Sequence, residues 1–323
     1  MASSATSIVS CCLLLLIFVA PALSGRSLAG PLRYDFYSSS CPRAEEVIRS
    51  VTQEIILEDN SMRGVFLMLF FYDCFTRGCD ASILLTKSES NPKPENHYFK
   101  FRGAGVINKV KAAVEAICPG VVSCADIIAL TARDSVTISG SFSFNMPTGR
   151  RDGLVSQWIT TGQVPSTFDH IQSIIDKFAA KGLNTDDLVA LFGAHSVGIA
   201  SCRYFVDHLS GTADPTFNAT YTAELRKLCN AGWYTVVNHN PMDPNHLSNQ
   251  YYKNVQSGNT LFTSDQALLN NSATAAKVAY FAANPTAWMA HFAGSLVKMG
   301  SIQVLTGSAG EIRKFCNVTN SGT

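Results

Sequence analysis

Cysteines are spread through almost the whole chain and limit the folds that it can adopt. The 323-residue sequence has ten cysteines, two of them inside an apolar N-terminal segment. The even set that remains is typical of four disulfides in a secreted protein. Free core thiols or a zinc site are the alternatives, but no two of these cysteines have the CxxC spacing of zinc ligands. Spacing alone fixes one pair, the short loop Cys74–Cys79; the others are Cys41, Cys118, Cys124, Cys202, Cys229 and Cys316.

The N-terminal segment predicts secretion. Residues 12–20 form an apolar run too short to span a bilayer, and the small residues at 22–24 suit signal cleavage. No Lys or Arg precedes the run, which departs from the usual signal pattern. We expect a signal peptide over 1–24, with cleavage as late as residue 30 as the alternative, and a single domain over 25–323. The N-glycosylation sequons fit a secreted glycoprotein; they lie at Asn218, Asn270 and Asn317.

Hydrophobic periodicity predicts an all-α fold. The chain is 46% hydrophobic and 15% charged, and its net charge of +1 argues against a nucleic-acid surface. Apolar stripes at helical spacing recur, whereas alternating strand patterns are scarce. No stretch after the leader predicts a transmembrane helix. Helices are expected over 44–55, 62–75, 106–117, 124–136, 168–178, 185–195 and 286–299, with polar loops at 86–97, 209–218 and 231–248.

One histidine lies in an apolar run that ends a predicted helix. Thr185 is the expected cap of this helix, and Gly193 and Gly198 bracket His195. A lone His among apolar residues is often a core histidine bonded to a backbone carbonyl. The alternative is a neutral imidazole that binds a metal or a haem iron, which also needs an acceptor for its second ring nitrogen. One histidine does not decide between these interpretations.

The segment after the 62–75 helix is rich in oxygen ligands. Asp73, Asp80 and Ser82 offer side-chain oxygens within ten residues, and Thr76 and Gly78 can offer backbone carbonyls. A disulfide between the two cysteines of this segment would curl it so that these oxygens converge. Hard oxygen ligands around one point suit Ca²⁺, although this is not an EF-hand loop. The alternative is a helix C-terminus with solvated Asp residues.

Several motifs together resemble the secretory (class III) plant haem peroxidases. They occur in the order found in that family and cover about residues 32–320. The motifs are FYDCFTRGCDASILL (71–85), SCPRAE (40–45), CPGVVSCAD (118–126), ARDSV (132–136), PTGRRDG (147–153), GAHSVG (193–198), SDQAL (264–268) and GEIRKFC (310–316).

The resemblance implies an all-α haem peroxidase fold of two helical lobes with haem b between them. His195 would be the axial iron ligand, Asp265 would accept its other ring N–H, and Pro165 would lie beside the site for aromatic reductants. Hydrogen peroxide and small phenolic donors would be the substrates, in hydrogen peroxide removal and the response to oxidative stress. The family also implies a monomer located outside the cell, in the apoplast or cell wall, or in the vacuole.

Calcium ligands and disulfides are implied by the same resemblance. The first calcium, on the distal side, would be bound by Asp73, Thr76, Gly78, Asp80 and Ser82. The disulfide pairs would be Cys41–Cys118, Cys74–Cys79, Cys124–Cys316 and Cys202–Cys229.

The sequence departs from this family on the distal side. The family has an Arg and, four residues later, a His over the iron, and these positions hold Met68 and Tyr72. Spacing i, i+4 places both on one helical face with Phe71, the retained distal aromatic residue. Tyr is a poor base at neutral pH and Met carries no charge, so we expect slower peroxide cleavage. Two roles stay open for Tyr72, packing beside Phe71 and ligation of the iron; His97 takes the position of a family Asn.

The second calcium site, on the proximal side, also departs from the pattern. Ser196 takes the position of a Thr beside His195 and could still bind the ion. The segment 242–250 looks shortened, Ser248 stands where an Asp is expected, and Asp243 is the remaining candidate. We expect one bound calcium and a second site that is weak or empty.

Three hypotheses about function remain at this point. The first is a secreted peroxidase with weakened peroxide cleavage. The second is a catalytically silent haem-binding protein that keeps the fold, and the third is a haem-free structural glycoprotein. A Soret absorption band separates the third from the others, and a peroxide–guaiacol assay separates the first from the second.

Overall fold

The computed structural model describes Met1 and residues 31–95, 102–140, 142–209 and 215–321. The expected signal peptide, apart from Met1, and His97 lie outside the described residues. No helix in the described part of the chain is long and apolar enough to cross a membrane. The expected all-α class is confirmed, since helices form every large element and the sheet has two short strands.

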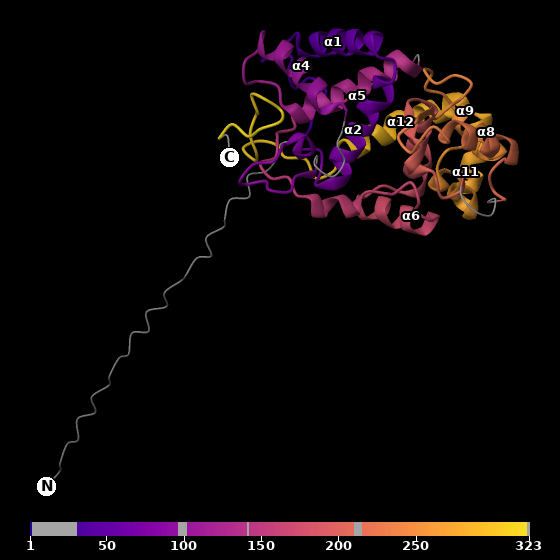
Figure 1. Cartoon of the computed structure of the whole chain (residues 1–323). Helices are drawn as coiled ribbons and strands as arrows, with labels where there is room; N and C mark the ends of the chain where they lie inside the picture. The colour runs from indigo at the N-terminus through magenta and orange to yellow at the C-terminus, as the bar shows by residue number, and fades with distance from the viewer. Residues whose placement is uncertain (2–30, 96–101, 141, 210–214, 322–323) are drawn as a thin grey trace.

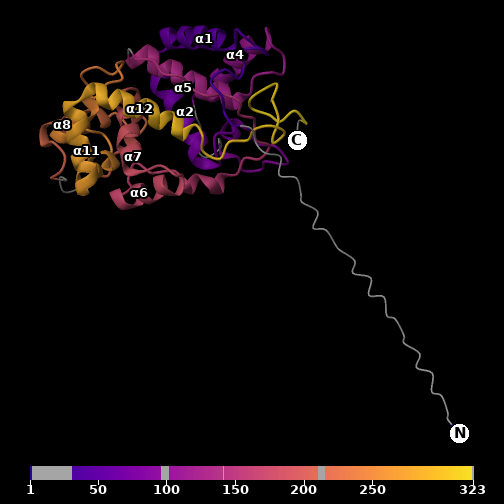
Figure 2. The same cartoon turned by 180° about the vertical axis from the view of Figure 1, so that it is seen from behind.

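Helices gather into two groups at opposite ends of the molecule (Figures 1 and 2). α1, α2, α4 and α5 pack on one another in the first group, and α7, α9, α11 and α12 in the second. Both views show α6 on the side away from α1. The first group comprises α1 (Ala44–Glu58), α2 (Met62–Thr76), α4 (Ala104–Glu115) and α5 (Cys124–Gly140). The second comprises α7 (Thr185–Phe192), α8 (Ala219–Cys229), α9 (Gln250–Ser257), α10 (Thr263–Ala267), α11 (Ser272–Ala283) and α12 (Pro285–Met299), with α6 (Ile171–Ala180) beside it.

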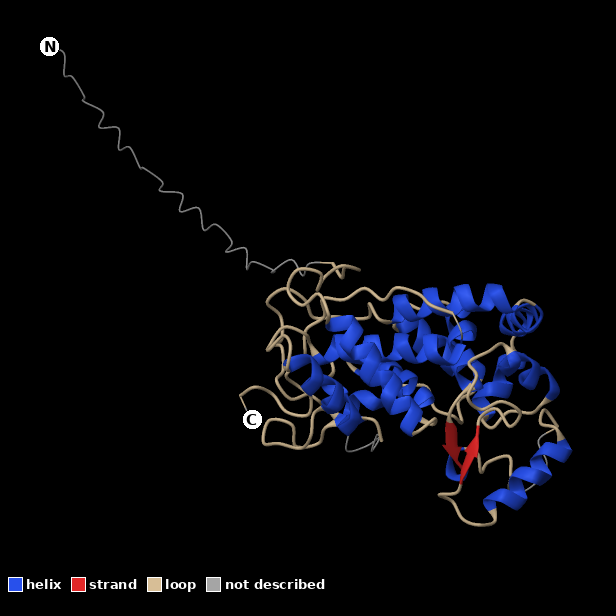
Figure 3. Ribbon diagram, turned by 90° about the horizontal axis from the view of Figure 1, so that it is seen from above, coloured by secondary structure: helices blue, strands red, loops and turns tan. Residues whose placement is uncertain are grey.

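Short elements connect these helices. The two-stranded antiparallel sheet pairs β1 (Ile199–Ser201) with β2 (Val236–Asn238), with Ala200 opposite Val237. It lies at the rim of the molecule (Figure 3), inside a region where the sequence predicted only loop on the β2 side. The 3₁₀ turns are η1 (Ser82–Leu84), η2 (Trp158–Gln163), η3 (Gly193–Ser196), η4 (Cys202–Tyr204) and η5 (Leu268–Asn270).

Helix α2 is apolar almost all round, and the structure buries it as such a composition requires. Its contacts with α5 and η3 place it between the two groups. Gly64 of α2 lies so close to Gly198, at φ +92°, that a Cβ on Gly64 would be 2.9 Å from the Gly198 Cα. Glycine at these two positions therefore brings the backbone of α2 against the segment that follows His195.

Two predicted helix starts were wrong. Asn184, not Thr185, caps α7: its side chain accepts from the Asp187 N–H, and the Asp187 carboxylate accepts from the Asn184 N–H, both at 2.9 Å. This reciprocal pair is a capping box, which satisfies two backbone donors at once. The helix predicted from residue 168 begins at Ile171, because the Asp169 carboxylate accepts from the Ser166 N–H and closes a turn ahead of it.

All four expected disulfides are present. Cys74–Cys79 closes a short loop at the end of α2, and Cys124–Cys316 joins the start of α5 to the C-terminal segment across 192 residues. Cys41–Cys118 and Cys202–Cys229 complete the set.

Candidate active site

His195 is presented by the 3₁₀ turn η3, where α7 ends. The expected helix stops at Phe192, because Gly193 begins the tighter turn. Carbonyl groups at the end of α7 are satisfied from outside the helix: the Tyr252 hydroxyl donates to Val189 O at 2.8 Å and Trp288 Nε1 donates to Ala190 O at 3.2 Å. These buried partners fix the end of the helix and so the position of His195.

The predicted partner of His195 is in contact with it. His195 Nδ1 lies 2.8 Å from Asp265 Oδ1, which also accepts from the Tyr251 hydroxyl at 2.8 Å. The Phe262 N–H donates to Asp265 Oδ2 at 3.2 Å. Asp265 is buried, so these three donors compensate for its loss of water. The hydrogen bond orients the imidazole and leaves Nε2 as the ring nitrogen for a ligand.

Two opposing effects act on the pKa of Asp265. Burial alone would raise it, but the nearby His195 ring and the hydrogen bonds from His195 and the Tyr251 hydroxyl together outweigh burial. The pKa of Asp265 therefore falls below its usual value. Asp265 is therefore a carboxylate, and His195 Nδ1 is the donor of their bond.

A second histidine lies flat against the first, and sequence reasoning missed it. The rings of His195 and His239 are nearly parallel, at 10°, with centroids 5.0 Å apart. The backbone N–H of His239 donates to Gly198 O at 3.0 Å, which holds the His239 backbone beside the segment that follows His195. Burial and then the neighbouring His195 lower the pKa of His239 to about 3, so this ring is neutral at physiological pH. It follows β2 in a polar segment without periodicity, which gave no signal in the sequence.

The α2 residues of the expected distal face share one stripe. Met68 is 38% exposed, and Phe71 and Tyr72 are half-buried, although most of α2 is buried. The Tyr72 ring packs edge-to-face on Phe71, with centroids 5.7 Å apart. The structure therefore places Met68, Phe71 and Tyr72 together on the open face of the helix.

Aromatic rings connect this face to His195. Phe71 is 6.3 Å from Phe178 of α6, Phe178 is 6.3 Å from Phe192, and Phe192 is 5.5 Å from His195, measured between ring centroids. Phe71 also stacks on Phe75 at 4.3 Å. These rings form a continuous apolar wall between α2 and η3, which neither helix pattern indicated from the sequence.

The predicted calcium loop contains buried oxygens without a hydrogen-bond partner. Asp73 Oδ2 accepts from the Ala81 N–H at 3.0 Å, but Asp73 Oδ1 and Ser82 Oγ are unpaired. Asp80 Oδ1 accepts from the Ser82 N–H at 2.9 Å. Burial raises the pKa of Asp73 well above its usual value, and the adjacent Asp80 raises it further. Two buried carboxylates with orphaned oxygen nearby need a cation, so the donor set fits Ca²⁺.

The carbonyl ligands expected from this loop are less free. Thr76 O accepts from Lys181 Nζ at 3.1 Å, and Gly78 O accepts from the Asp80 N–H at 2.8 Å. A carbonyl oxygen has two lone pairs, so each keeps one for an ion. Within the described ranges no three His, Cys, Asp or Glu side chains form a metal cluster, and the loop therefore relies on two carboxylates with hydroxyl and carbonyl oxygen.

The candidate ligands of the second calcium are engaged with one another. The Ser196 hydroxyl donates to Gly193 O at 2.9 Å and accepts from the Ser248 N–H at 3.0 Å. Asp243 is exposed. The buried amide of Asn240, a residue that the sequence analysis missed, donates to Asp243 O at 3.1 Å and accepts from the Met242 N–H. Neutral hydrogen bonds hold this segment, which lacks the buried carboxylate pair of the first loop.

Comparison with known proteins decides the family. A family model described as peroxidase matches residues 48–284, most of the chain. The chain belongs to the peroxidase family. It is similar to Peroxidase 1 of Zea mays, which is 40% identical over 98% of this chain and 89% of the relative. Peroxidase 15 of Ipomoea batatas is 41% identical over 88% of this chain and 91% of the relative. Cationic peroxidase SPC4 of Sorghum bicolor is 40% identical over 91% of this chain and 83% of the relative. The resemblance to the plant secretory peroxidases is thereby confirmed.

The residues of this peroxidase fit a haem. The His195 side chain is 32% exposed between the buried Phe192 and Ser196, with its Nδ1 already bonded to Asp265. The open stripe of α2 and the aromatic wall provide an apolar surface for a flat ring. Pro165 is half-buried and follows Val164, whose carbonyl accepts from Lys177 Nζ at 3.2 Å.

Proposed function

We propose that this chain is a secreted haem b protein that uses hydrogen peroxide to oxidise small phenolic donors, with peroxide cleavage weakened on the α2 side. Family membership supports the class of activity. The observation that carries the proposal is the buried Asp265 carboxylate 2.8 Å from His195 Nδ1, because a ligand histidine needs such an acceptor. Haem b, when bound, supplies the iron at which peroxide is reduced and donors are oxidised.

On the proximal side the proposed roles are binding and orientation. Asp265 takes the hydrogen bond of Nδ1–H and so fixes the tautomer in which Nε2 carries the lone pair for iron. The same bond makes the imidazole a stronger electron donor. Tyr251 holds the carboxylate from its other side. His239 supports the plane of the His195 ring.

On the α2 side two roles of the family are altered. A phenol of ordinary pKa, about 10, is a poor acceptor for the first peroxide proton. Met68 offers neither positive charge nor a hydrogen bond to the departing oxygen. General acid–base help contributes about 10²–10⁴-fold and an oriented charge about 10²–10³-fold. The losses overlap, so we infer that peroxide cleavage is slower by at least one order of magnitude, while Phe71 keeps the pocket apolar.

The ion and donor sites complete the proposal. Asp73, Asp80 and Ser82, with the Thr76 and Gly78 carbonyls, would bind one calcium that stabilises the end of α2. The proximal site of Ser196, Asp243 and Ser248 would be weak or empty, and Pro165 would lie near phenolic donors. We propose a monomer in the extracellular space, the cell wall or the vacuole.

A catalytically silent haem protein is the second candidate, and the Met68–Tyr72 pair favours it. Both candidates predict a Soret band for purified protein reconstituted with haem. They separate in an assay of guaiacol oxidation with hydrogen peroxide, compared with free haem at the same concentration. Turnover well above free haem supports the enzyme. Turnover no higher than free haem, with a normal Soret band, supports the silent protein, and absence of a Soret band removes both.

A further inference from the structure

Three exposed aromatic side chains gather beside the small sheet, far from any role in the proposed haem site. Tyr204 of η4 is 39% exposed, and Trp233 and Tyr234, just before β2, are 61% and 76% exposed. The Arg203 N–H donates to Trp233 O at 3.1 Å, which brings η4 against this segment. Clustered exposed rings on a protein surface are typical of a binding surface. Tyr204, Trp233, Tyr234 and Arg203 are called the aromatic–arginine patch below.

Arg203 lies between two of these rings. Its guanidinium carbon is 4.6 Å from the centroid of the Tyr204 ring and 5.2 Å from that of Tyr234. Its Nη2 donates to the Tyr204 hydroxyl at 2.7 Å. Among residues that the structure describes, this exposed guanidinium has no carboxylate partner at ion-pair distance. The rings hold the planar group in place and leave donors free for an anion.

The backbone under the patch is held by a disulfide and a backbone hydrogen bond. Cys202, next to Arg203, is bonded to Cys229 at the end of α8, and the Cys202 N–H donates to Thr235 O at 2.9 Å. The disulfide therefore joins the residue next to Arg203 to the end of α8. A patch on such a base is ordered before any ligand arrives, which lowers the entropy lost on binding.

We propose that the aromatic–arginine patch binds an acidic polysaccharide, a chain of uronic acid residues. Flat exposed rings match the C–H face of a pyranose ring, and a fixed guanidinium matches a carboxylate through two parallel hydrogen bonds. A neutral glycan would leave Arg203 unused, and a nucleic acid would need a larger basic surface. The net charge of the whole chain is only +1, so general attraction to a polyanion is weak and the local patch decides binding.

The test measures binding of the haem-loaded full-length protein to immobilised polygalacturonate, with dextran as the neutral polymer. Binding to polygalacturonate should exceed that to dextran and fall as salt is raised. Arg203→Ala should weaken it at least about tenfold, since hydrogen bonds to a charged group are lost. Arg203→Lys should weaken binding several-fold, because the positive charge remains but the two parallel hydrogen bonds of the guanidinium are lost. Tyr234→Ala should weaken binding even at high salt, because the contact between the ring and the sugar is lost. Tyr234→Phe keeps the ring and should leave binding unchanged.

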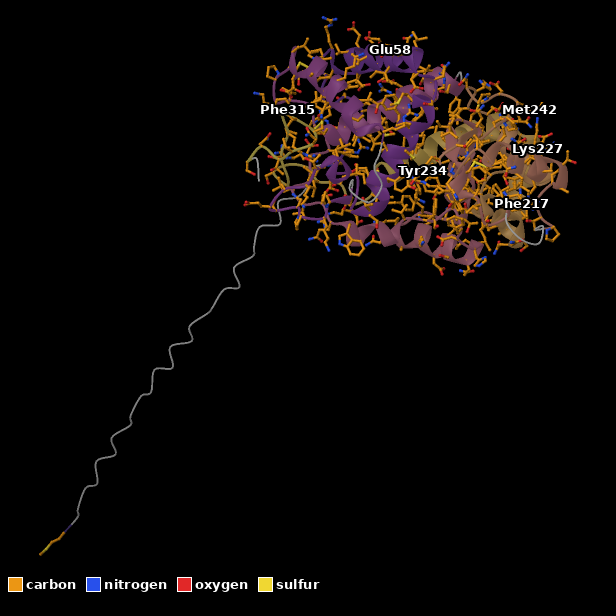
Figure 4. All side chains as sticks on the ribbon, in the orientation of Figure 1. Glu58, Phe217, Lys227, Tyr234, Met242 and Phe315 are labelled. Carbon is orange, nitrogen blue, oxygen red and sulfur yellow. A yellow bond between two sulfur atoms is a disulfide. The ribbon has the colours of Figure 1, made fainter. Side chains whose placement is uncertain are left out.

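A matched control lies elsewhere on the surface. Lys314 is 5.9 Å from the centroid of the exposed Phe315 ring, another cation–aromatic pair. Figure 4 shows Phe315 at one edge of the molecule, away from Tyr234. Lys314→Ala should leave binding unchanged. Equal binding to dextran and polygalacturonate, or an equal loss from Lys314→Ala and Arg203→Ala, overturns the proposal. If Arg203→Ala lowers the melting temperature, the Tyr234→Ala and Tyr234→Phe pair decides.

Discussion

Two sites were expected on the side around His195, and two on the side built on α2. On each side, one site has the expected residues and the other departs from the expected pattern. Around His195, the imidazole–carboxylate pair is complete, but the Ser196 hydroxyl is already bonded to Gly193 O and to the Ser248 N–H. On α2, the positions proposed for peroxide chemistry hold Met68 and Tyr72, but the Asp73 loop keeps buried, unpaired oxygens that suit a cation.

The difference lies in how deeply each group is buried. Asp265 and Asp73 are buried carboxylates, and removing the partner of such a charge costs stability of the whole fold. Met68 and Tyr72 lie on the open stripe of α2, where substitution changes chemistry with little effect on packing. We infer that burial ties Asp265 and Asp73 to the fold, whereas the open positions of Met68 and Tyr72 can vary without a loss of packing.

The largest effect should come from the His195 side. His195→Ala removes the imidazole whose Nδ1 is bonded to Asp265, and it should abolish stable haem binding. Loss of the Soret band and of iron after gel filtration would show this. His239→Phe keeps a flat ring against His195 and should retain haem. Equal haem content in His195→Ala and the wild type would show that the complete pair has another purpose.

The next largest effect should come from restoring the α2 side. Met68→Arg with Tyr72→His should raise the second-order rate of the reaction with hydrogen peroxide by at least about tenfold. Stopped-flow absorption of the haem-loaded proteins measures this rate. Met68→Leu with Tyr72→Phe is the control and should give no increase. A wild type that already reacts as fast as the restored variant would show that Met68 and Tyr72 do not weaken peroxide cleavage.

The calcium loop should show a moderate effect on stability. An ion at 100 times its Kd that binds only the native state contributes about 2.7 kcal/mol, so Asp80→Ala should lower Tm by roughly 5 °C or more. Metal analysis should give one calcium in the wild type and none in the variant. Asp243→Ala should change neither quantity. Two calcium ions per chain, with one lost in Asp243→Ala, would contradict the proposed difference between the sides.

The smallest effect should follow removal of one hydroxyl. If Tyr72 packs on Phe71 and does not bind the iron, Tyr72→Phe keeps that contact and should leave the ferric absorption spectrum unchanged. Loss of a six-coordinate spectrum with a tyrosinate charge-transfer band, together with faster cyanide binding, would instead identify Tyr72 as an iron ligand. Either result sharpens the description of the α2 side.

Sequence reasoning reached the elements whose signal is local or carried by a motif. The apolar α2, the His195–Asp265 pair and the four disulfides came from periodicity and family motifs. It missed α8, α9, α10 and α11. Polar residues dominate α8 and α9, so tertiary packing decides there. It missed His239 and Asn240 because contacts made by irregular segments leave no periodic pattern. The cap of α7 went to Thr185 because Thr and Asn are both good caps, and only the bond to Asp187 distinguishes them.

The Cys124–Cys316 bond also sets an order of events during synthesis. Its two cysteines are 192 residues apart, so the first must wait unpaired until nearly the whole chain has been made. At about 5–20 residues per second this wait lasts roughly 10–40 s. The partners of Cys41 and Cys74 emerge earlier, and their early pairing removes competitors for Cys124. A truncated chain that stops before Cys316 would leave Cys124 exposed as a free thiol in an oxidising compartment, open to mispairing and retention by quality control.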